Sequence, residues 1–299
     1  MSLFDGEPLV DRPKRTRVRR GSWSWGPVEG AKLRVLSLGA GVQSTTLALM
    51  AAHGEIGPMP DFAIFADTGD EGARTMETVD WLAGGNVLPF PIVRVAGPGR
   101  LSDAVLERAS SRAQSFQPVP FYTARGIGKR ECTSHYKIEP INRELRRRLG
   151  YRPRQRVPVG SVEVWIGFSA DEMVRITPAM EPWIVNRAPL CEPVERGGAG
   201  MLTRAGCIAW LKRHGYPVPP NSACVFCPFM ADRDRRVQRD EDPSEFANAC
   251  AIDAALRAPG RRPEFVHPSR KPLAQVDLST AEERGQGNML TVCEAGCGL

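Results

Sequence analysis

A loop of small residues near the start of the chain is suited to binding phosphate. The apolar run 33–38 leads into the loop 39–44 (GAGVQS), and an apolar segment with helical periodicity follows. Small side chains let backbone N–H groups approach phosphate oxygens, and a helix N-terminus adds partial positive charge. We therefore expect a nucleotide phosphate here. The candidate binding residues are Ser37, Gly39, Ala40, Gly41, Gln43, Ser44 and Thr45.

The context of this loop makes it more specific than a glycine-rich turn, which also occurs in proteins without any ligand. The loop follows the first predicted strand, where nucleotides bind in doubly wound sheets. No Gly-Lys-Ser/Thr follows, so the loop is not a Walker loop, and it does not have the spacing of a dinucleotide fingerprint. A different class of nucleotide loop is the better interpretation.

A second candidate site is the pair Cys224 and Cys227, which form a Cys-x-x-Cys followed by a proline. This spacing lets two thiolates reach one metal ion or cluster. Buried cysteines also pack as small hydrophobic residues, which is the alternative interpretation. Ligands that are all thiolates suit either an iron–sulfur cluster or zinc, and the sequence does not choose between them.

The remaining polar candidates carry weaker signals. Cys293 and Cys297 lie near the C-terminus, where a thiolate could attack sulfur or the two could cycle as a dithiol, unless both are incidental. His53 and His214 are expected at the surface or as helix caps. The segment 232–239 holds four arginines and is expected to be a solvated helix face.

The elements that must position these residues alternate along the chain. Apolar runs predict strands, and segments with helical periodicity separate them, so we expect a parallel sheet covered on both faces. The predicted strands are 33–38, 62–66, 91–95 and 162–168, and the predicted helices are 44–52, 73–82, 101–113, 138–149 and one beginning at 170.

Three regions are predicted from these patterns. Residues 1–30 are expected to be a basic flexible arm, and 31–185 to be the nucleotide-binding domain. Residues 186–299 are expected to form a smaller, mostly helical, cysteine-containing C-terminal subdomain with a tail. The predicted fold class is thus α/β, with a doubly wound parallel sheet and an added subdomain.

Composition restricts the class of protein further. The chain has 299 residues, of which 42% are hydrophobic and 25% charged, which is ordinary for a globular protein. The net charge is +6, and six arginines and lysines lie in residues 12–20, which suits an anionic partner. No apolar run approaches the roughly 20 residues that span a bilayer. Without an apolar signal segment we expect a cytoplasmic protein, in which any clustered pair among its eight cysteines serves a metal or redox role rather than a disulfide.

Four segments, in order along the chain, resemble the PAPS (phosphoadenosine phosphosulfate) reductase family of the PP-loop superfamily, which has an adenine nucleotide alpha hydrolase-like (HUP-like) fold. The loop 39–44 resembles Ser-Gly-Gly-x-Asp-Ser, with Gln43 in place of the aspartate that would help to hold Mg²⁺. Residues 65–69 (FADTG) resemble the Asp-Thr-Gly turn. The resemblance implies that Asp67 and Thr68 lie beside the adenosine.

Two further segments carry the resemblance. Residues 132–141 (CTSHYKIEPI) are similar to Cys-Cys-x-x-x-Lys-x-x-Pro-Leu, with one cysteine instead of two. Residues 167–175 (GFSADEMVR) are similar to Gly-x-Arg-x-x-Glu-Ser-x-x-Arg, with Ser169 where the first arginine is usual. The resemblance implies that Gly167 contacts the nucleotide and that Lys137 and Arg175 are catalytic cations.

The resemblance also implies a cofactor and a nucleophile. Related reductases hold a [4Fe-4S] cluster, which here would bind Cys132, Cys224 and Cys227, with zinc as the alternative. Cys207 is the first choice for a fourth ligand and Cys191 the second, and a vacant position is chemically sensible too. The ending Cys297-Gly298-Leu299 matches part of the family's C-terminal sequence, which implies that Cys297 is the nucleophile.

These observations leave three hypotheses. The first is a PAPS reductase-like enzyme that acts on PAPS or APS (adenosine phosphosulfate) with a thiol partner such as thioredoxin. The second is an ATP pyrophosphatase, with Mg²⁺ as a candidate partner of the ATP, which inserts sulfur into DNA or tRNA through an iron–sulfur cluster. The third is a non-catalytic, zinc-containing nucleic-acid-binding protein, which leaves the phosphate loop unexplained.

Overall fold

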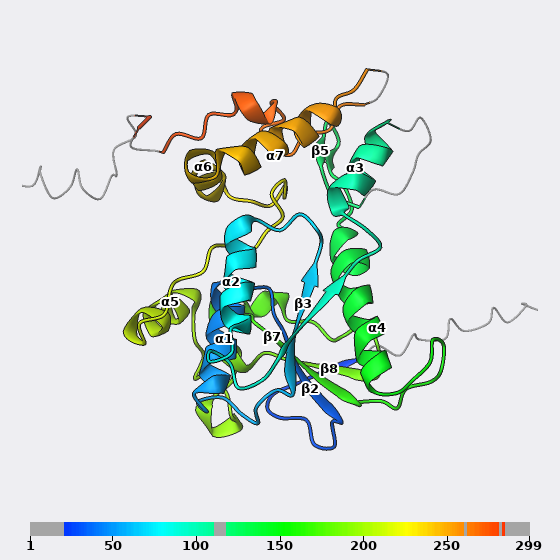
Figure 1. The fold of residues 1–299 in the computed structure, drawn as a ribbon, viewed down its shortest axis with the longest axis vertical. Coiled ribbons are helices and arrows are strands. Elements are labelled where there is room, and N and C mark those ends of the chain that lie inside the picture. The colour runs from blue at the N-terminus through cyan, green and yellow to red at the C-terminus, as the bar shows by residue number, and fades with distance from the viewer. Residues whose placement is uncertain (1–20, 111–117, 260–261, 281–282, 285–299) are drawn as a thin grey trace, which may run out of the picture.

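A six-stranded parallel sheet forms the centre of the molecule (Figure 1). The computed structural model describes residues 21–110, 118–259, 262–280 and 283–284. All neighbouring strands pair in parallel. In spatial order the strands are β1 (Ser22–Ser24), β8 (Ile184–Arg187), β7 (Val162–Ile166), β2 (Leu33–Ser37), β3 (Phe62–Asp67) and β4 (Ile92–Ala96).

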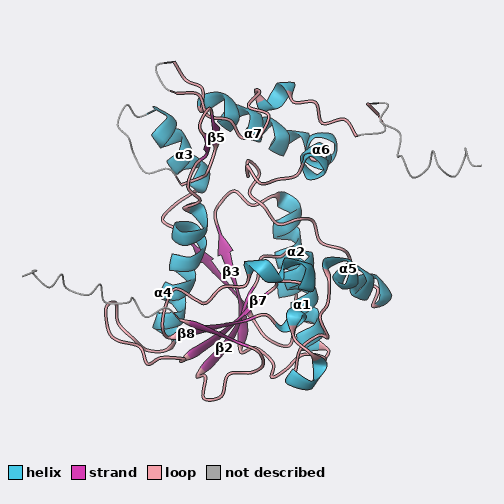
Figure 2. Ribbon diagram, turned by 180° about the vertical axis from the view of Figure 1, so that it is seen from behind, coloured by secondary structure: helices cyan, strands magenta, loops and turns pink. Residues whose placement is uncertain are grey.

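Helices cover both faces of this sheet, as Figures 1 and 2 show from opposite sides. One face carries α1 (Val42–Ala52), α2 (Ala73–Ala83) and α5 (Arg204–Arg213), and the other carries α4 (Glu139–Arg148). The predicted fold class, a doubly wound α/β sheet, is confirmed. The observed bounds of the first three predicted strands and helices differ from the predictions by one or two residues, apart from α3.

The alternation of side chains along the strands creates the two cores. Leu36 and Trp165 face the core that contains α1 and α5, whereas their neighbours Val35 and Val164 pack on the α4 side with Leu145. Successive residues of a strand point to opposite faces, so uninterrupted apolar strands bury both sides. The helix α1 is buried on nearly its whole circumference, since it lies between the sheet and α5.

A further, smaller core, separate from the two on the faces of the sheet, lies beyond one end of the sheet. It joins α3 (Leu101–Ser110) to α7 (Pro243–Ala255), and α6 (Asp232–Glu241) packs against α7. The short hairpin β5–β6 lies in the same part of the molecule (Figure 1). The remaining elements are β5 (Tyr122–Thr123), β6 (Gly126–Ile127), a π-helix at Thr133–Ile138 and 3₁₀ helices at Ala170–Arg175, Pro189–Cys191, Val194–Arg196 and Leu273–Gln275.

The predicted region boundaries at 30/31 and 185/186 do not separate these cores. Strand β1 belongs to the predicted arm but pairs with β8 in the main sheet, and β8 itself spans the second boundary. Helix α5 packs on α1, whereas α3 joins the smaller core. These contacts cross the predicted boundaries because sheet pairing and helix docking join segments far apart in sequence. Residues 1–20 of the predicted arm lie outside the described residues.

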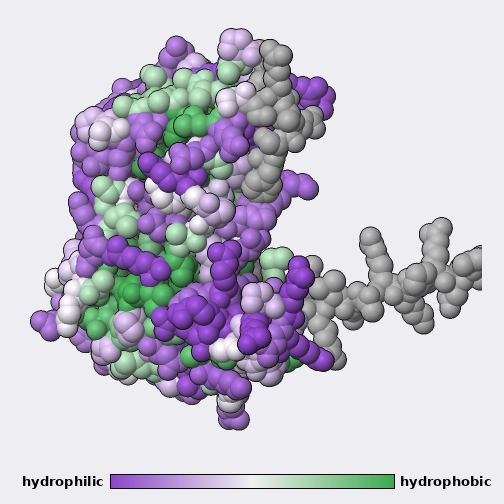
Figure 3. Space-filling model, turned by 45° about the vertical axis from the view of Figure 1, so that its right-hand side comes forward, coloured by the Kyte–Doolittle hydropathy of each residue, from purple (hydrophilic) through white to green (hydrophobic). Residues whose placement is uncertain are grey.

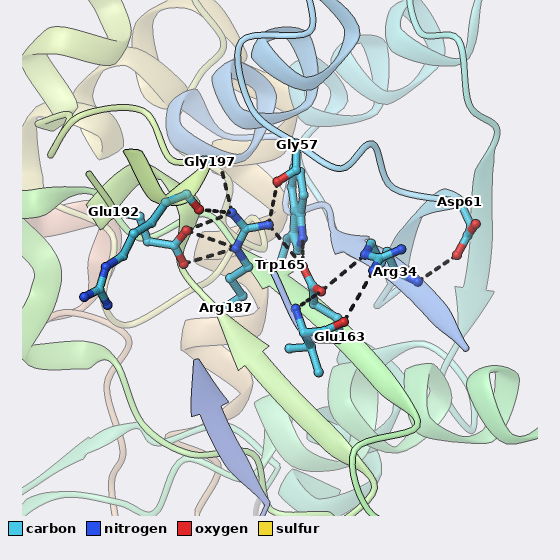
Figure 4. Close-up of polar contacts among 10 residues, drawn as sticks. Arg34, Gly57, Asp61, Glu163, Trp165, Arg187, Glu192 and Gly197 are labelled. Carbon is cyan, nitrogen blue, oxygen red and sulfur yellow. Dashed lines mark hydrogen bonds and ion pairs between the residues drawn. The ribbon is translucent and has the colours of Figure 1, made fainter. Parts of the chain in front are cut away.

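A buried network of charges fastens β7 and β8 to the loops beside them (Figure 4). The guanidinium of Arg187 pairs with Glu163 at 3.2 Å and with Glu192 at 2.8 Å, and all three side chains are fully buried. Arg187 also donates to the carbonyl oxygens of Gly57 and Gly197. Buried charges persist where partners satisfy them, and here each oxygen and nitrogen has a place in the network.

The surface of the molecule carries both hydrophobic and hydrophilic residues. On the face drawn in Figure 3, hydrophobic residues gather in an upper and a lower area, with hydrophilic side chains between them. Within the described residues, no helix has the length and apolar character needed to cross a membrane. The longest of these helices, α7, has 13 residues, against the roughly 20 that a span requires.

Candidate functional site

The loop 39–44, named the phosphate loop after its predicted ligand, lies at the point where the strand order of the sheet reverses. The chain proceeds from β2 to β3 and β4 on one side, and β7 and β8 fill the other side. Because β2 and β7 are parallel neighbours, with Ser37 opposite Ile166, the segments after them leave the sheet together. Ligands of doubly wound folds bind in the crevice at such a switch point. The topology thus favours a ligand between the loop 39–44 and Gly167.

The backbone of the loop has the conformation that small residues permit. Ala40 adopts the left-handed region with φ 55°, at a position where the resembled family has glycine. Gly41 caps α1, and among the residues that the structure describes no side chain caps the first N–H groups of that helix. Ser44 Oγ accepts from the Gly39 N–H at 3.2 Å and donates to the Gly41 carbonyl at 3.3 Å. The loop is therefore braced from within, and its helix start remains available to an anion.

One cavity of about 680 Å³ brings together most of the predicted site residues. This volume lies within the range of small-molecule sites. The predicted residues that line it are Ser37, Gly39, Gly41, Gln43, Ser44, Thr68, Cys132, Lys137, Gly167, Arg175, Cys224 and Cys227. The phosphate loop and three cysteines thus share one space, although more than 80 residues separate Ser44 from Cys132 and again Cys132 from Cys224.

Three residues predicted to bind nucleotide do not line this cavity. Ala40 is fully buried among Phe65 and other apolar side chains, and Thr45 is fully buried on α1. Asp67 accepts a hydrogen bond from the Gly69 N–H at 2.7 Å and closes a turn. Their role in the structure is to shape the two loops, because the helix and turn direct these side chains away from the cavity.

The three cysteines in the cavity come from two segments. Cys132 precedes the π-helix, and Cys224 and Cys227 belong to a tight turn in which the Cys227 N–H donates to the Cys224 carbonyl at 3.0 Å. Burial, followed by the nearby carboxylate of Glu71, raises the pKa of Cys224 well above its usual range. Burial also raises the pKa of Cys227. A cation bound among these sulfurs would oppose both effects and favour the thiolates.

Cys207 is not with these three, which corrects its choice as the fourth ligand. It lies fully buried in the core between α5 and α1, beside Trp210 and Leu211. These residues occupy positions i, i+3 and i+4, the buried stripe of an amphipathic helix. Burial raises the pKa of Cys207 to about 12. Cys191, the second choice, is also fully buried and does not line the cavity, and Cys293 and Cys297 lie outside the described residues.

Arg235 supports the site, although the sequence analysis did not predict this role. The prediction of a solvated face for 232–239 is wrong at this position, where the side chain is buried. Its guanidinium donates to the carbonyls of Val225 at 2.6 Å and Cys227 at 3.0 Å, inside the Cys-x-x-Cys turn. Gln238, one turn further along α6, donates to the same Val225 carbonyl. Two polar residues of α6 therefore hold the cysteine turn in place.

Glu172 is a second residue that sequence reasoning missed. Its Oε2 accepts from the side-chain amide of Gln43 at 3.0 Å, and its other oxygen pairs with Arg175. Glu172 and Gln43 both line the cavity, so a carboxylate stands next to the position where the resembled loop carries aspartate. The segment 167–175, with its family-like Glu, contained this signal, but the contact across 129 residues depends on the fold.

Lys137 reaches the cavity as an ion pair with a carboxylate behind it. Its Nζ lies 3.1 Å from Oε1 of Glu71, whose side chain is buried. Burial, the largest single effect, would lower the pKa of Lys137, but the charge and hydrogen bond of Glu71 together with the nearby Cys224 and Cys132 outweigh it, so the pKa is raised. Glu71 also forms a β-bridge with Cys224, which ties this pair to the cysteine turn. The lysine is therefore held as a cation beside the cysteines.

The lining of the cavity carries a net positive charge. Its ionised side chains are four cations and two carboxylates, which suits an anion with several negative charges. Arg130 stacks on the half-exposed ring of Phe229 at 5.1 Å, which places an aromatic and a cationic group at the rim. The charged lining residues are Arg130, Lys137, Arg175, Arg204, Glu172 and Asp234.

Comparisons with known proteins give distant likenesses among solved structures only. No protein-family model matches the chain, and no curated protein matches it. Among solved structures, the chain is similar to the crystal structure of phosphoadenylyl-sulfate (PAPS) reductase from Candida auris, in a phosphate complex. The two share 15% sequence identity over 62% of this chain and 74% of that chain, with a TM-score of 0.39.

Proposed function

We propose that this protein is an enzyme that binds an adenylated or sulfated adenine nucleotide and carries out sulfur transfer or reduction on it, in the manner of a PAPS reductase. The observation that carries this proposal is the shared cavity: the phosphate loop after β2 and the cysteines Cys132, Cys224 and Cys227 line the same space. A phosphate site alone would fit many nucleotide enzymes. Thiols beside it favour chemistry at sulfur.

The nucleotide phosphates would lie on the loop 39–44, against the first N–H groups of α1. The cations that reach the cavity, such as Lys137 and Arg175, would neutralise the charge that builds on a leaving phosphate. Gly167 closes the floor of the site, because a Cβ there would lie 2.9 Å from the backbone of Ser44. The adenosine would extend toward the end of β3, where Thr68 lines the cavity.

The cysteines suit an iron–sulfur cluster, for which three thiol ligands stand ready in one wall of the cavity. Such a [4Fe-4S] cluster would bind Cys132, Cys224 and Cys227 and would supply redox or sulfur-carrying chemistry. Arg235 and Gln238 would keep the turn rigid beneath it.

In the reductase reaction, the thiolate of Cys297 attacks the sulfonate sulfur of PAPS or APS. A sulfur–sulfur bond forms as the bond from sulfur to the phosphate oxygen breaks, and the nucleotide leaves with the electron pair. A thiol of a partner such as thioredoxin, or Cys293, then attacks the sulfur of Cys297. This releases sulfite and leaves a disulfide, so the thiols are oxidised by two electrons.

A second candidate is an ATP pyrophosphatase that inserts sulfur into DNA or tRNA. Glu172 favours it, because this carboxylate bonds to Gln43 and gives the loop the negative charge that Mg²⁺ with ATP requires. An oxygen of the nucleic acid would attack the α-phosphorus and release pyrophosphate, and a sulfide donor would then displace AMP. The basic residues 12–20, outside the described residues, would bind the nucleic acid.

The test is to incubate the full, anaerobically purified chain separately with ATP, PAPS and APS and to identify the products. The reductase yields sulfite with a thiol reductant, and C297S abolishes it without weakening nucleotide binding. The pyrophosphatase yields pyrophosphate and AMP from ATP when nucleic acid is present. If the chain binds and converts none of the three nucleotides, the proposal is wrong.

A pair of glycine variants locates the nucleotide in the same assay. A Cβ at Gly41 would lie 3.1 Å from Ser222 Oγ, so Gly41→Val should obstruct the loop and weaken binding at least about tenfold. Gly85→Ala is the matched control, because nothing lies within 4 Å of its added Cβ. Equal affinities of the two variants would place the nucleotide elsewhere.

Metal content tests the cofactor by itself. Iron and sulfide in near-equal amounts are expected after anaerobic purification, and Cys224→Ser should lose most of both. Cys207→Ser should keep them, because Cys207 lies in the core away from the cavity. Zinc alone in the wild-type chain would refute the cluster.

A further inference from the structure

Two helices that pack side by side end in the same way. Helix α1 ends at His53 and α5 ends at His214, and each histidine precedes a glycine in the left-handed conformation, with φ 74° at both Gly54 and Gly215. A glycine of this kind terminates a helix and lets the chain turn away. Since α1 and α5 pack together, the two helix ends bring the two imidazole rings to 5.2 Å between centroids.

Glu55 completes a group of three potential metal ligands. One ligand atom from each of His53, Glu55 and His214 lies within 4.8 Å of the other two, and all three side chains are exposed. Among the described residues, no other three histidine, cysteine or acidic side chains bring their ligand atoms within 4.8 Å of one another. It lies at the opposite end of α1 from the phosphate loop, about 16 Å away for an 11-residue helix.

The surroundings orient His214 and Glu55 as ligands. His214 Nδ1 lies 2.9 Å from the Trp210 carbonyl, which can only accept, so Nδ1 carries the proton and the Nε2 lone pair is free. That Nε2 lies 3.8 Å from Glu55 Oε1, while Oε2 of Glu55 accepts from the indole N–H of Trp210 at 3.0 Å. The imidazole also stacks on the Trp210 ring at 4.0 Å. Hydrogen bonds of this kind fix the orientation of metal-binding histidines and carboxylates.

His53 has a comparable support. Its Nε2 lies 2.9 Å from the hydroxyl of Tyr216, and its ring meets Trp210 edge to face at 5.5 Å. With the proton on Nε2 donated to that hydroxyl, the Nδ1 lone pair is available to a metal ion. The backbone N–H of Tyr216 donates to the Leu211 carbonyl at 2.9 Å, so the supporting tyrosine is itself fixed to the end of α5.

We propose that His53, Glu55 and His214 form a binding site for one divalent transition-metal ion, with Zn²⁺ as the best-matched ion. Two imidazole nitrogens and one carboxylate oxygen are a common zinc donor set, and water would fill the open position. Ligand atoms round zinc stand about 3.4 Å apart at bond lengths near 2.1 Å. Exposed side chains can close from the present spacing by small rotations.

The consequence of this site is a cross-link between α1 and α5. Binding to the folded chain alone adds stability that grows with metal concentration. The ion would fasten the end of α1 whose other end carries the phosphate loop, and thus hold α5 on the sheet domain. Because the site shares no residue with the cysteine cavity, it is independent of the proposed enzymatic function.

The test must separate this site from the thiols, which also bind zinc. The metal-free full chain is titrated with Co²⁺ and with Zn²⁺, alongside His214→Gln, Glu55→Gln and the control Glu77→Gln, which removes an exposed carboxylate elsewhere. We expect one Co²⁺ whose d–d absorption lacks thiolate charge transfer, in addition to any ion held by the thiols, in the wild type and in the control. The two site variants should bind this ion at least about tenfold more weakly.

A thermal measurement provides the second readout. Zn²⁺ should raise the melting temperature of the wild type more than that of either site variant, with all metal-free chains compared by circular dichroism to verify folding. If His214→Gln fails to fold, Glu55→Gln, whose side chain is exposed, carries the test. Cobalt spectra with only thiolate bands, or equal metal affinities in the control and site variants, would refute the proposal.

Discussion

The candidate site depends on single residues whose size or charge leaves little choice. Gly167 touches the start of α1 so closely that no side chain fits, and Glu172 restores a carboxylate beside Gln43. The pair of Lys137 and Glu71 holds a cation against the cysteines. Each of these contacts joins two segments far apart in the sequence, so the site is an assembly of the sheet's loops rather than one motif.

Replacing Gly167 tests how closely the two loops must meet. In Gly167→Ala, the new Cβ would lie 2.9 Å from both N and Cα of Ser44, which is backbone and cannot rotate away. We expect a loss of about 1–3 kcal/mol in the free energy of unfolding, as for overpacked sites. Nucleotide affinity should also fall, as titration calorimetry would measure.

The control for this variant is Gly85→Ala, where the added Cβ meets nothing within 4 Å. Its stability should stay within about 0.5 kcal/mol of the wild type, as for most surface substitutions. Equal stability and affinity of Gly167→Ala and Gly85→Ala would show that the loop has room which the structure does not give it.

At the scale of elements, α6 supports the site without entering the sheet. Arg235 and Gln238 lie on one face of this helix and bind the carbonyls of the Cys-x-x-Cys turn, while Arg236 and Arg239 on its other side pair with surface acids. Burial lowers the pKa of Arg235, but its carbonyl partners satisfy the charged form. One helix thus combines a buried polar contact with a solvated face.

The variant Arg235→Met measures this support. It removes two hydrogen bonds from a charged donor to the turn, each of which contributes about 1.5–3 kcal/mol, although Gln238 and the Met230 N–H still donate to these carbonyls. We expect a lower midpoint of urea unfolding and a reduced iron content after anaerobic purification. Arg239→Ala, on the exposed side, should change neither by a measurable amount.

Iron content unchanged in Arg235→Met would mean that the turn keeps its shape without α6. A fall in stability with full iron content would restrict the role of Arg235 to folding. Only the joint loss supports a link between the helix and the cysteines.

At the scale of the whole molecule, the hydrophobic cores and one buried charge network hold the parts together. Two cores cover the faces of the sheet, and the smaller core joins α3 to α7. The network of Arg187, Glu163 and Glu192 connects β7 and β8 to the segment that leads into α5 (Figure 4). After α5 the chain continues to the cysteine turn, so the network fixes the start of the connection from β8 to that turn.

Removing the central cation of this network, Arg187, should lower the free energy of unfolding. Arg187→Met leaves two buried carboxylates without their main partner, and breaking such a pair costs about 3–5 kcal/mol. Arg34→Met is the matched comparison: its side chain is partly exposed and lies 3.4 Å from the same Glu163, so it should cost less. Chemical unfolding of both variants checks the order, and equal losses would contradict it.

Local signals along the chain were enough to predict part of this fold. Glycines and apolar runs at 33–44 and 162–167 fixed the strands and the phosphate loop, because strand burial and tight turns depend on neighbouring residues. Strand β8, which spans the predicted boundary at 185/186, is not among the predicted strands, because it is short and its partners β1 and β7 come from other segments. Strands of this length have too few residues to show a period.

By itself, the sequence determined the α/β class and predicted the loop 39–44 and three cysteines as site residues, because residue type and short spacing carry that information. Only the tertiary structure decided which polar residues face inward. It placed Cys207 in the core, Arg235 beneath the cysteine turn and His53 beside His214. The physical reason is that burial and pairing across long sequence separations follow from how helices pack, which no local pattern specifies.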